Sequence, residues 1–104
     1  MGKSWLLVWL PGLILLACPA AGGTQRTVTN EWSVNIESLS DSSPAIGPDG
    51  TIYVGTWNNR FWAIGTDGST KWVFRAGSEI KSSPALALDG TLYFGCRDRK
   101  LYAL

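Results

Sequence analysis

Short apolar stretches alternate with polar turn residues along the chain from about residue 30 onward. Residues 51–56, 60–65 and 70–76 are rich in β-branched and aromatic side chains, and a shorter apolar stretch, 43–47, precedes them. Such stretches favour β-strands, and the Pro-Asp-Gly, Asn-Asn and Thr-Asp-Gly sequences between them favour tight turns. No stretch has apolar residues at helical spacing over the length of a helix. The pattern therefore predicts an all-β fold of short antiparallel strands.

The strand pattern returns after about 40 residues, a period that indicates a repeat architecture. Residues 42–64 read SSPAIGPDGTIYVGTWNNRFWAI, and residues 82–104 read SSPALALDGTLYFGCRDRKLYAL. Upstream of both copies, Trp32 corresponds to Trp72, which predicts that residues 30–36 form a strand like 70–76. The repeat region therefore divides into three parts, which are an outer strand (30–41), a first repeat (42–81) and a partial second repeat (82–104).

The predicted strands are apolar on both faces, which indicates a sheet that is covered on both sides. In residues 51–55, Ile52 and Val54 point one way and Tyr53 points the other. An isolated antiparallel sheet usually keeps one polar face. Stacking four-stranded units around an axis covers both faces, and four strands in about 40 residues match a β-propeller blade. A β-sandwich is the alternative, but it would not explain the repeat.

The repeat resembles the PQQ-like β-propeller repeat over residues 31–104. The resemblance rests on Asp-Gly-Thr-(Ile/Leu)-Tyr-(Val/Phe)-Gly, a following strand such as Lys-Leu-Tyr-Ala-Leu, and then Asp-Gly before Lys-Trp. It implies that the tryptophan ending each blade docks against the next blade and that the strand glycines allow close backbone approach. It thus gives structural roles to ten residues, which are Trp32, Trp72, Asp49, Gly50, Tyr53, Gly55, Asp89, Gly90, Tyr93 and Gly95.

Residues 1–23 differ from the rest of the chain and are expected to be a secretory signal peptide. Lys3 is followed by an apolar run over residues 5–17, shorter than the roughly 20 residues that a bilayer-spanning helix needs. The end of the run, Leu-Leu-Ala-Cys, resembles a bacterial lipoprotein cleavage box, in which Cys18 would be lipidated. Ordinary cleavage within 17–23 is the alternative. Either places the protein in the periplasm or outside the cell, with a polar linker over 24–29.

Composition narrows the classes of function. The chain has no histidine and a formal net charge of +1. This balance gives no electrostatic case for nucleic acid, or for a membrane contact other than a lipid anchor. Asp49 and Asp89 each precede glycine and are interpreted as turn formers rather than as catalytic acids or metal ligands. We therefore expect no catalytic residue, no metal site and no cofactor.

The predicted strands amount to about two blades, whereas propellers typically have about 4 to 8. The favoured explanation is that the chain is the N-terminal part of a longer propeller. In proteins that it resembles, an N-terminal strand completes the last blade. The alternative is a ring of several copies, each lending its outer strand to its neighbour. In both cases the expected partners include other blades or chains of a propeller.

The resemblance implies a non-enzymatic module for protein binding or scaffolding, like the outer-membrane assembly lipoproteins. The candidate surface for a protein or peptide partner consists of two polar loops, one with Trp57, Asn58 and Asn59 and one with Arg97 and Arg99. A loop tryptophan can anchor a partner, although the favoured interpretation of Trp57 is that it covers a blade edge. The alternative function is a fragment of a PQQ-dependent dehydrogenase. The repeat lacks that enzyme's docking motif, because Gly65 stands at its Asp position.

Overall fold

The computed structural model describes residues 26–104, and within them the regular structure consists of strands and turns without a helix. The expected signal peptide and its Cys18 lie outside the described residues. Residues 26–30 are exposed and irregular. Both sheets belong to the unit Glu31–Leu104, which is described by itself. The prediction of an all-β fold with tight antiparallel turns is confirmed.

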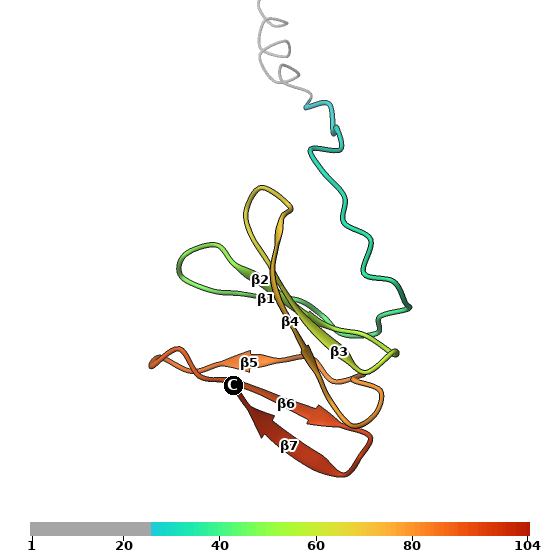
Figure 1. Cartoon of the computed structure of the whole chain (residues 1–104). Helices are drawn as coiled ribbons and strands as arrows, with labels where there is room; N and C mark the ends of the chain where they lie inside the picture. Colours follow the sequence, from blue (N-terminus) through green and yellow to red (C-terminus); the bar gives the residue numbers. More distant parts are fainter. Residues whose placement is uncertain (1–25) are drawn as a thin grey trace, which may run out of the picture. The chain divides into compact units, whose positions relative to one another are not determined.

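The first repeat forms a four-stranded antiparallel sheet in which neighbours in sequence are neighbours in the sheet (Figure 1). Each apolar stretch of the sequence gives one strand, and the first three strands end shortly before the expected turn residues. The strands are β1 (Ala45–Ile46), β2 (Ile52–Gly55), β3 (Arg60–Ile64) and β4 (Thr70–Arg75).

The second repeat forms a three-stranded antiparallel sheet with the same connectivity. Its register copies that of the first sheet, since Ala45 pairs with Tyr53 and Ala85 pairs with Tyr93. The strands are β5 (Ala85–Leu86), β6 (Leu92–Cys96) and β7 (Lys100–Ala103).

Apolar side chains between the two sheets form the core. The Phe61 ring of β3 stacks on the Phe94 ring of β6 with their centroids 4.2 Å apart. Phe74 of β4 meets Tyr102 of β7 edge to face at 5.5 Å. Ile80 lies in the segment that joins the sheets, is fully buried and packs in the same cluster. One face of the first sheet is therefore covered by the second sheet, as the two-sided apolar pattern requires.

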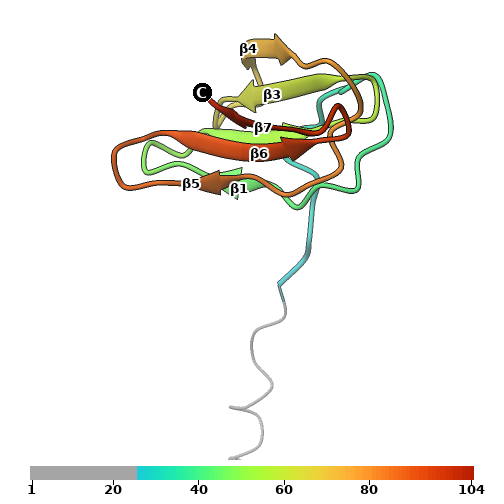
Figure 2. The same ribbon diagram turned by 90° about the horizontal axis from the view of Figure 1, so that it is seen from below.

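The two sheets also meet at their first strands. β1 and β5 lie side by side (Figure 2). The Ser43 backbone N–H donates to the hydroxyl of Ser83, the residue at the same position of the next repeat, at 2.9 Å. The sheets are thus neighbours in both sequence and space.

The expected outer strand over residues 30–36 does not form in the structure. These residues are irregular, whereas the corresponding residues of the next repeat form β4. The difference follows from pairing, because β4 bonds to β3 and no strand within residues 26–104 lies beside 30–36. An extended segment without a partner strand leaves its backbone groups to water.

Gly55 and Gly95 share a repeat position but differ in their surroundings, which gives a matched test of the packing. A Cβ atom on Gly55 would lie 2.9 Å from Ile80 Cβ and closer still to its Cγ2 methyl group. A Cβ atom on Gly95 would lie 3.7 Å from Ser82 Oγ, an ordinary contact. We expect Gly55→Ala to lower the free energy of unfolding by about 1–3 kcal/mol through overpacking.

Gly95→Ala is the control and should change the free energy of unfolding by less than about 0.5 kcal/mol. Urea unfolding followed by circular dichroism measures both variants. Equal losses in the two variants would contradict the close approach of Ile80 to β2.

Candidate functional site

The two candidate loops are equivalent turns of the two sheets. Trp57, Asn58 and Asn59 lie in the turn between β2 and β3, and Arg97 and Arg99 lie in the turn between β6 and β7. Asn59 and Arg99 both adopt a left-handed backbone, with φ of 68° and 70°. This conformation suits asparagine better than arginine. The same turn is therefore built from different side chains in the two sheets.

The segment between the sheets connects the two turns. The Arg97 backbone N–H donates to the Glu79 carbonyl at 3.1 Å. The Ile80 backbone N–H donates to the Thr56 carbonyl, at the start of the first turn, at 3.0 Å. Residues 79 and 80 thus hold both turns at one end of the sheets. We call the surface formed by residues 57–59, 79–81 and 97–99 the turn surface.

Trp57 is engaged within the chain rather than free. Its indole N–H donates to Asp41 Oδ2 at 3.2 Å. The Lys81 ammonium lies 3.7 Å from the centroid of its ring, a cation–π contact. The side chain is half-buried. Trp57 therefore covers the joint between the first sheet and the segment that follows it, with one edge left at the surface.

Sequence reasoning missed Asp41 and Lys81 as the partners of Trp57. These residues occupy equivalent positions before the Ser-Ser-Pro of each repeat, and they carry opposite charges.

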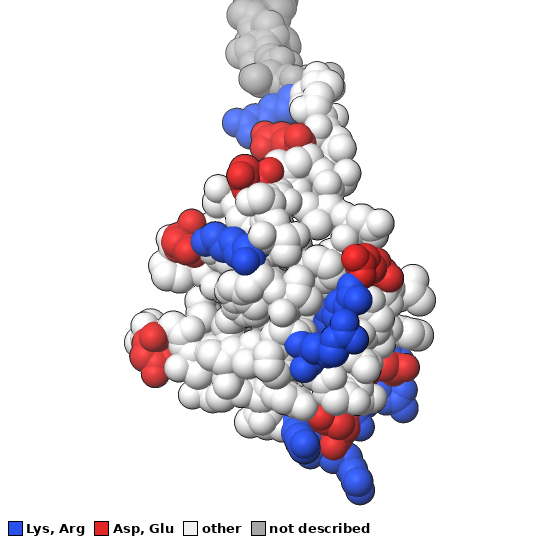
Figure 3. All heavy atoms as spheres, in the orientation of Figure 1, with Lys and Arg blue, Asp and Glu red and all other residues white. Residues whose placement is uncertain are grey.

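The charged groups of the turn surface pair with one another. Glu79 accepts a hydrogen bond from the Arg97 guanidinium at 2.8 Å and lies 3.6 Å from the Lys81 ammonium. The hydrogen bond from Arg97 is the main reason that the pKa of Glu79 is lowered. Arg99 is exposed and has no ion-pair partner within residues 26–104. Figure 3 shows basic and acidic side chains interspersed over the face in view.

Asp98 supports the turn from inside. Its Oδ2 accepts a hydrogen bond from the Tyr102 hydroxyl at 2.6 Å, and that hydroxyl accepts one from the Gly77 backbone N–H at 3.3 Å. The bond lowers the pKa of Asp98 and raises the pKa of Tyr102. In the first sheet, Asn58 takes the corresponding place and accepts from the buried Thr56 hydroxyl at 2.6 Å. Both side chains hold the turns in shape.

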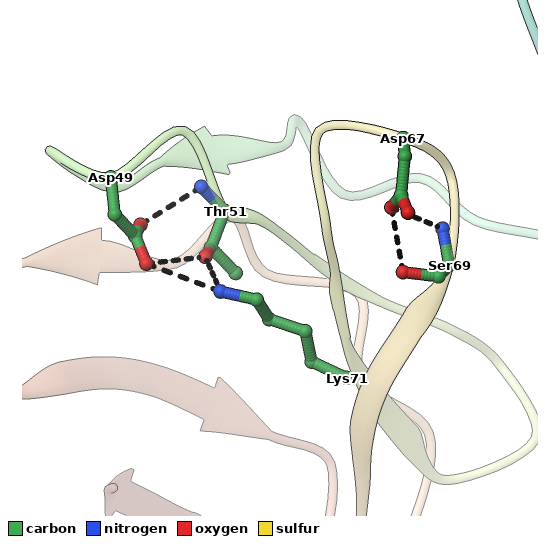
Figure 4. A network of polar contacts seen from close by, with 5 residues as sticks. All are labelled: Asp49, Thr51, Asp67, Ser69 and Lys71. Carbon is green, nitrogen blue, oxygen red and sulfur yellow. Dashed lines mark hydrogen bonds and ion pairs between the residues drawn. The ribbon is translucent and has the colours of Figure 1, made fainter.

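The aspartates at the opposite end of the sheets hold their own turns (Figure 4). Asp49 accepts from the Thr51 backbone N–H at 2.9 Å and from its hydroxyl at 2.8 Å. The Lys71 ammonium donates to both side chains, at 3.2 Å to Asp49 Oδ2 and 2.7 Å to Thr51 Oγ1. Asp67 and Asp89 accept from the backbone N–H two residues on, at 3.0 Å and 2.9 Å. The carboxylate oxygens of these aspartates thus accept the hydrogen bonds that close their own turns.

The glycine after each of these aspartates completes the turn. Gly50, Gly68 and Gly90 have φ of 87°, 86° and 92°, a left-handed backbone that only glycine adopts without strain. Asp-Gly therefore forms the turn at both Asp49–Gly50 and Asp89–Gly90.

The two equivalent tryptophans have different surroundings. The Trp32 indole N–H donates to the Thr66 carbonyl at 3.0 Å, and its ring packs on Gly68 in the turn between β3 and β4. Trp72 lies on β4 with its ring centroid 5.9 Å from that of Tyr53. Tyr93, the equivalent of Tyr53, is exposed. Trp32 thus joins the N-terminal segment to the first sheet, while Trp72 packs across its own sheet.

The described residues form no site of another kind. Residues 26–104 contain no pocket and no group of three His, Cys, Asp or Glu side chains placed to hold a metal ion. Among the same residues there is no helix of the length and apolarity that crossing a membrane would require. No known protein family matches this chain. A search of curated proteins also found no match.

The Asp49 network makes a prediction about pH. Hydrogen bonds from Thr51, first from its backbone N–H, lower the pKa of Asp49 from 3.8 to about 2. A carboxyl whose pKa is lower in the folded state stabilises the fold above pH 3.8 and loses this contribution as the pH falls through about 2. Carboxyl NMR titration should therefore place the Asp49 midpoint near 2.

Thr51→Val should raise the Asp49 midpoint by removing the hydroxyl donor, and Lys71→Met should raise it less. Thr91→Val, at the equivalent position of the second repeat, is the control and should leave Asp49 unchanged. A wild-type midpoint at the ordinary value would contradict the network.

Proposed function

We propose that this chain is a non-enzymatic module of a β-propeller that acts outside the cytoplasm, where it binds or scaffolds other proteins. The propeller part of the proposal is supported by the repeat and by the way successive sheets pack. Each repeat gives an antiparallel sheet, and Phe61 of one sheet stacks on Phe94 of the next. The remaining blades come from further sequence or from other chains.

The observation that carries the binding function is the turn surface. Two turns from different repeats lie at one end of the sheets and are joined through residues 79–81. The surface offers the exposed edge of a half-buried tryptophan, Trp57, beside the exposed guanidinium groups of Arg97 and Arg99. Trp and Arg are the residue types that most often dominate the binding energy of protein interfaces.

The chemistry of this surface suits a protein or peptide partner that carries carboxylates. Arg99 is free to pair with an acidic group, and a planar guanidinium binds a carboxylate with two hydrogen bonds. Lys81 is held over Trp57 and Glu79 is held by Arg97, so the surface is ordered before a partner arrives. An ordered surface loses less conformational entropy on binding.

Photo-crosslinking inside the expressing cells tests this surface. A photoreactive amino acid at position 99 should give a discrete crosslinked band, because Arg99 is exposed on the turn surface and free to pair with an acidic group. The same amino acid at position 88 is the control, since Leu88 is fully exposed in the turn between β5 and β6, at the other end of the same sheet. Bands of equal strength at both positions, or none at 99, would contradict the proposal.

The location outside the cytoplasm is tested at Cys18. We expect the processed chain to begin at Cys18 and to incorporate radioactive palmitate, because the Leu-Leu-Ala-Cys sequence resembles a lipoprotein cleavage box. Cys18→Ser should abolish the label, and Cys96→Ser is the matched control that should retain it. A mature N-terminus within residues 19–24 and no label in the wild type would show ordinary signal cleavage instead.

A further inference from the structure

The outer edge of β7 is the least complete part of the structure. In the first sheet, the equivalent strand β3 is paired on both sides, by β2 and β4. In the second sheet β7 is the last strand, and no strand within residues 26–104 pairs with its outer edge. Leu101 is 73% exposed, although Phe61 at the same repeat position is fully buried. An unpaired strand edge with exposed apolar side chains is a template for another strand.

Residues 31–41 lie beside the first sheet in the place that residues 71–81 occupy beside the second sheet. The Trp57 backbone N–H donates to the Leu39 carbonyl at 3.0 Å, and the Arg97 backbone N–H donates to the Glu79 carbonyl at 3.1 Å. These bonds join equivalent residues of successive repeats. Residues 31–41 therefore approach the first sheet as residues 71–81, which include most of β4, approach the second sheet.

We propose that the outer edge of β7 binds residues 30–35 of a second copy of this chain as an antiparallel fourth strand. The pairing of β3 with β4 supplies the register, because Phe61 pairs with Phe74 and Ala63 pairs with Trp72. Leu101 and Ala103 lie 40 residues after Phe61 and Ala63, and Val34 and Trp32 lie 40 residues before Phe74 and Trp72. The same register between equivalent residues therefore pairs Leu101 with Val34 and Ala103 with Trp32 of the second copy. The exposed Leu101 side chain thereby gains an apolar neighbour.

The N-terminal segment can make this contact while it remains packed on the first sheet of its own chain. Trp32 remains on the turn between β3 and β4, where its indole N–H donates to Thr66. Residues 30–35 then bridge two copies, because the Trp32 side chain stays bound to its own chain while the backbone pairs with β7 of the other copy. Each copy offers one segment and one edge, so the contact is head-to-tail and closes into a ring or continues as an open chain.

The number of copies in a closed ring follows from the proposed blade arrangement. Each copy supplies about two blades, and propellers have about 4 to 8, so about two to four copies would close the ring. This inference rests on the propeller arrangement proposed above but not on the turn surface. Arg99 directly precedes β7, so the mass of the product crosslinked at position 99 separates the two proposals. A product of two copies of this chain reports the β7 contact, and a product with another protein reports the turn surface.

Proline substitution tests the pairing by light scattering of the processed protein. The wild-type chain should form a discrete oligomer. Val34→Pro should weaken its self-association at least tenfold, because proline removes a backbone donor from the new strand. Val28→Pro is the matched control, because Val28 is 94% exposed in the irregular residues before the segment, and it should leave the oligomer intact. No described hydrogen bond uses the Val34 N–H, so the fold of each copy should persist.

Cysteine crosslinking tests the register and the involvement of two chains. In a Cys96→Ser background, a chain carrying Val34→Cys is mixed with a chain carrying Leu101→Cys and oxidised mildly. We expect a disulfide-linked heterodimer, identified by mass spectrometry of the joined peptides. Leu88→Cys replaces Leu101→Cys in the control mixture and should give at least tenfold less heterodimer, since Leu88 is more accessible than Leu101 but lies in the turn between β5 and β6, away from β7.

A monomeric or unfolded wild-type chain would overturn the proposal. So would an oligomer that Val34→Pro leaves unchanged, or equal crosslinking of Val34→Cys to both positions. A longer gene product in which another strand already occupies the edge of β7 would appear as a folded monomer, and would count against it in the same way.

Discussion

The close approach of two sheets around Ile80 is the constraint on which the rest of the structure depends. Ile80 is fully buried between them and lies against Gly55, where a side chain would collide with it. This approach brings Phe61 and Phe94 to stacking distance and places the segment around Glu79 where it can bond to both turns. The polar turn surface is therefore a consequence of apolar packing a few residues away.

Much of the fold could be predicted from the sequence, because the strands and turns are specified locally. The apolar stretches set the strands, and Asp-Gly at Asp49 and Asp89 sets turns that the aspartate closes with its own carboxylate. The prediction failed at residues 30–36, which carry a strand-like sequence but have no partner strand among the described residues. A segment with a strand-like sequence forms a strand only when its backbone groups find hydrogen-bond partners. Those partners come from tertiary or quaternary contacts.

The candidate site could be predicted only in outline. The polar loops around Trp57 and Arg97 were recognisable, because loops of a repeat protein lie at the ends of its sheets. Their joining through Asp41, Glu79 and Lys81 was not recognisable, because those side chains belong to the segment between repeats rather than to either loop. The family resemblance suggests a function and the turn surface is our proposal for where it acts, since a fold alone does not determine activity.

The order of the strands has a consequence for how the chain would fold during the export that we propose for it. Every strand pairs only with strands that directly precede or follow it in sequence, so each sheet can form from residues that emerge together, with short loops to close. A chain that threads through a secretion channel from its N-terminus could complete the first sheet before β5 appears. The second sheet would then assemble on an existing apolar surface.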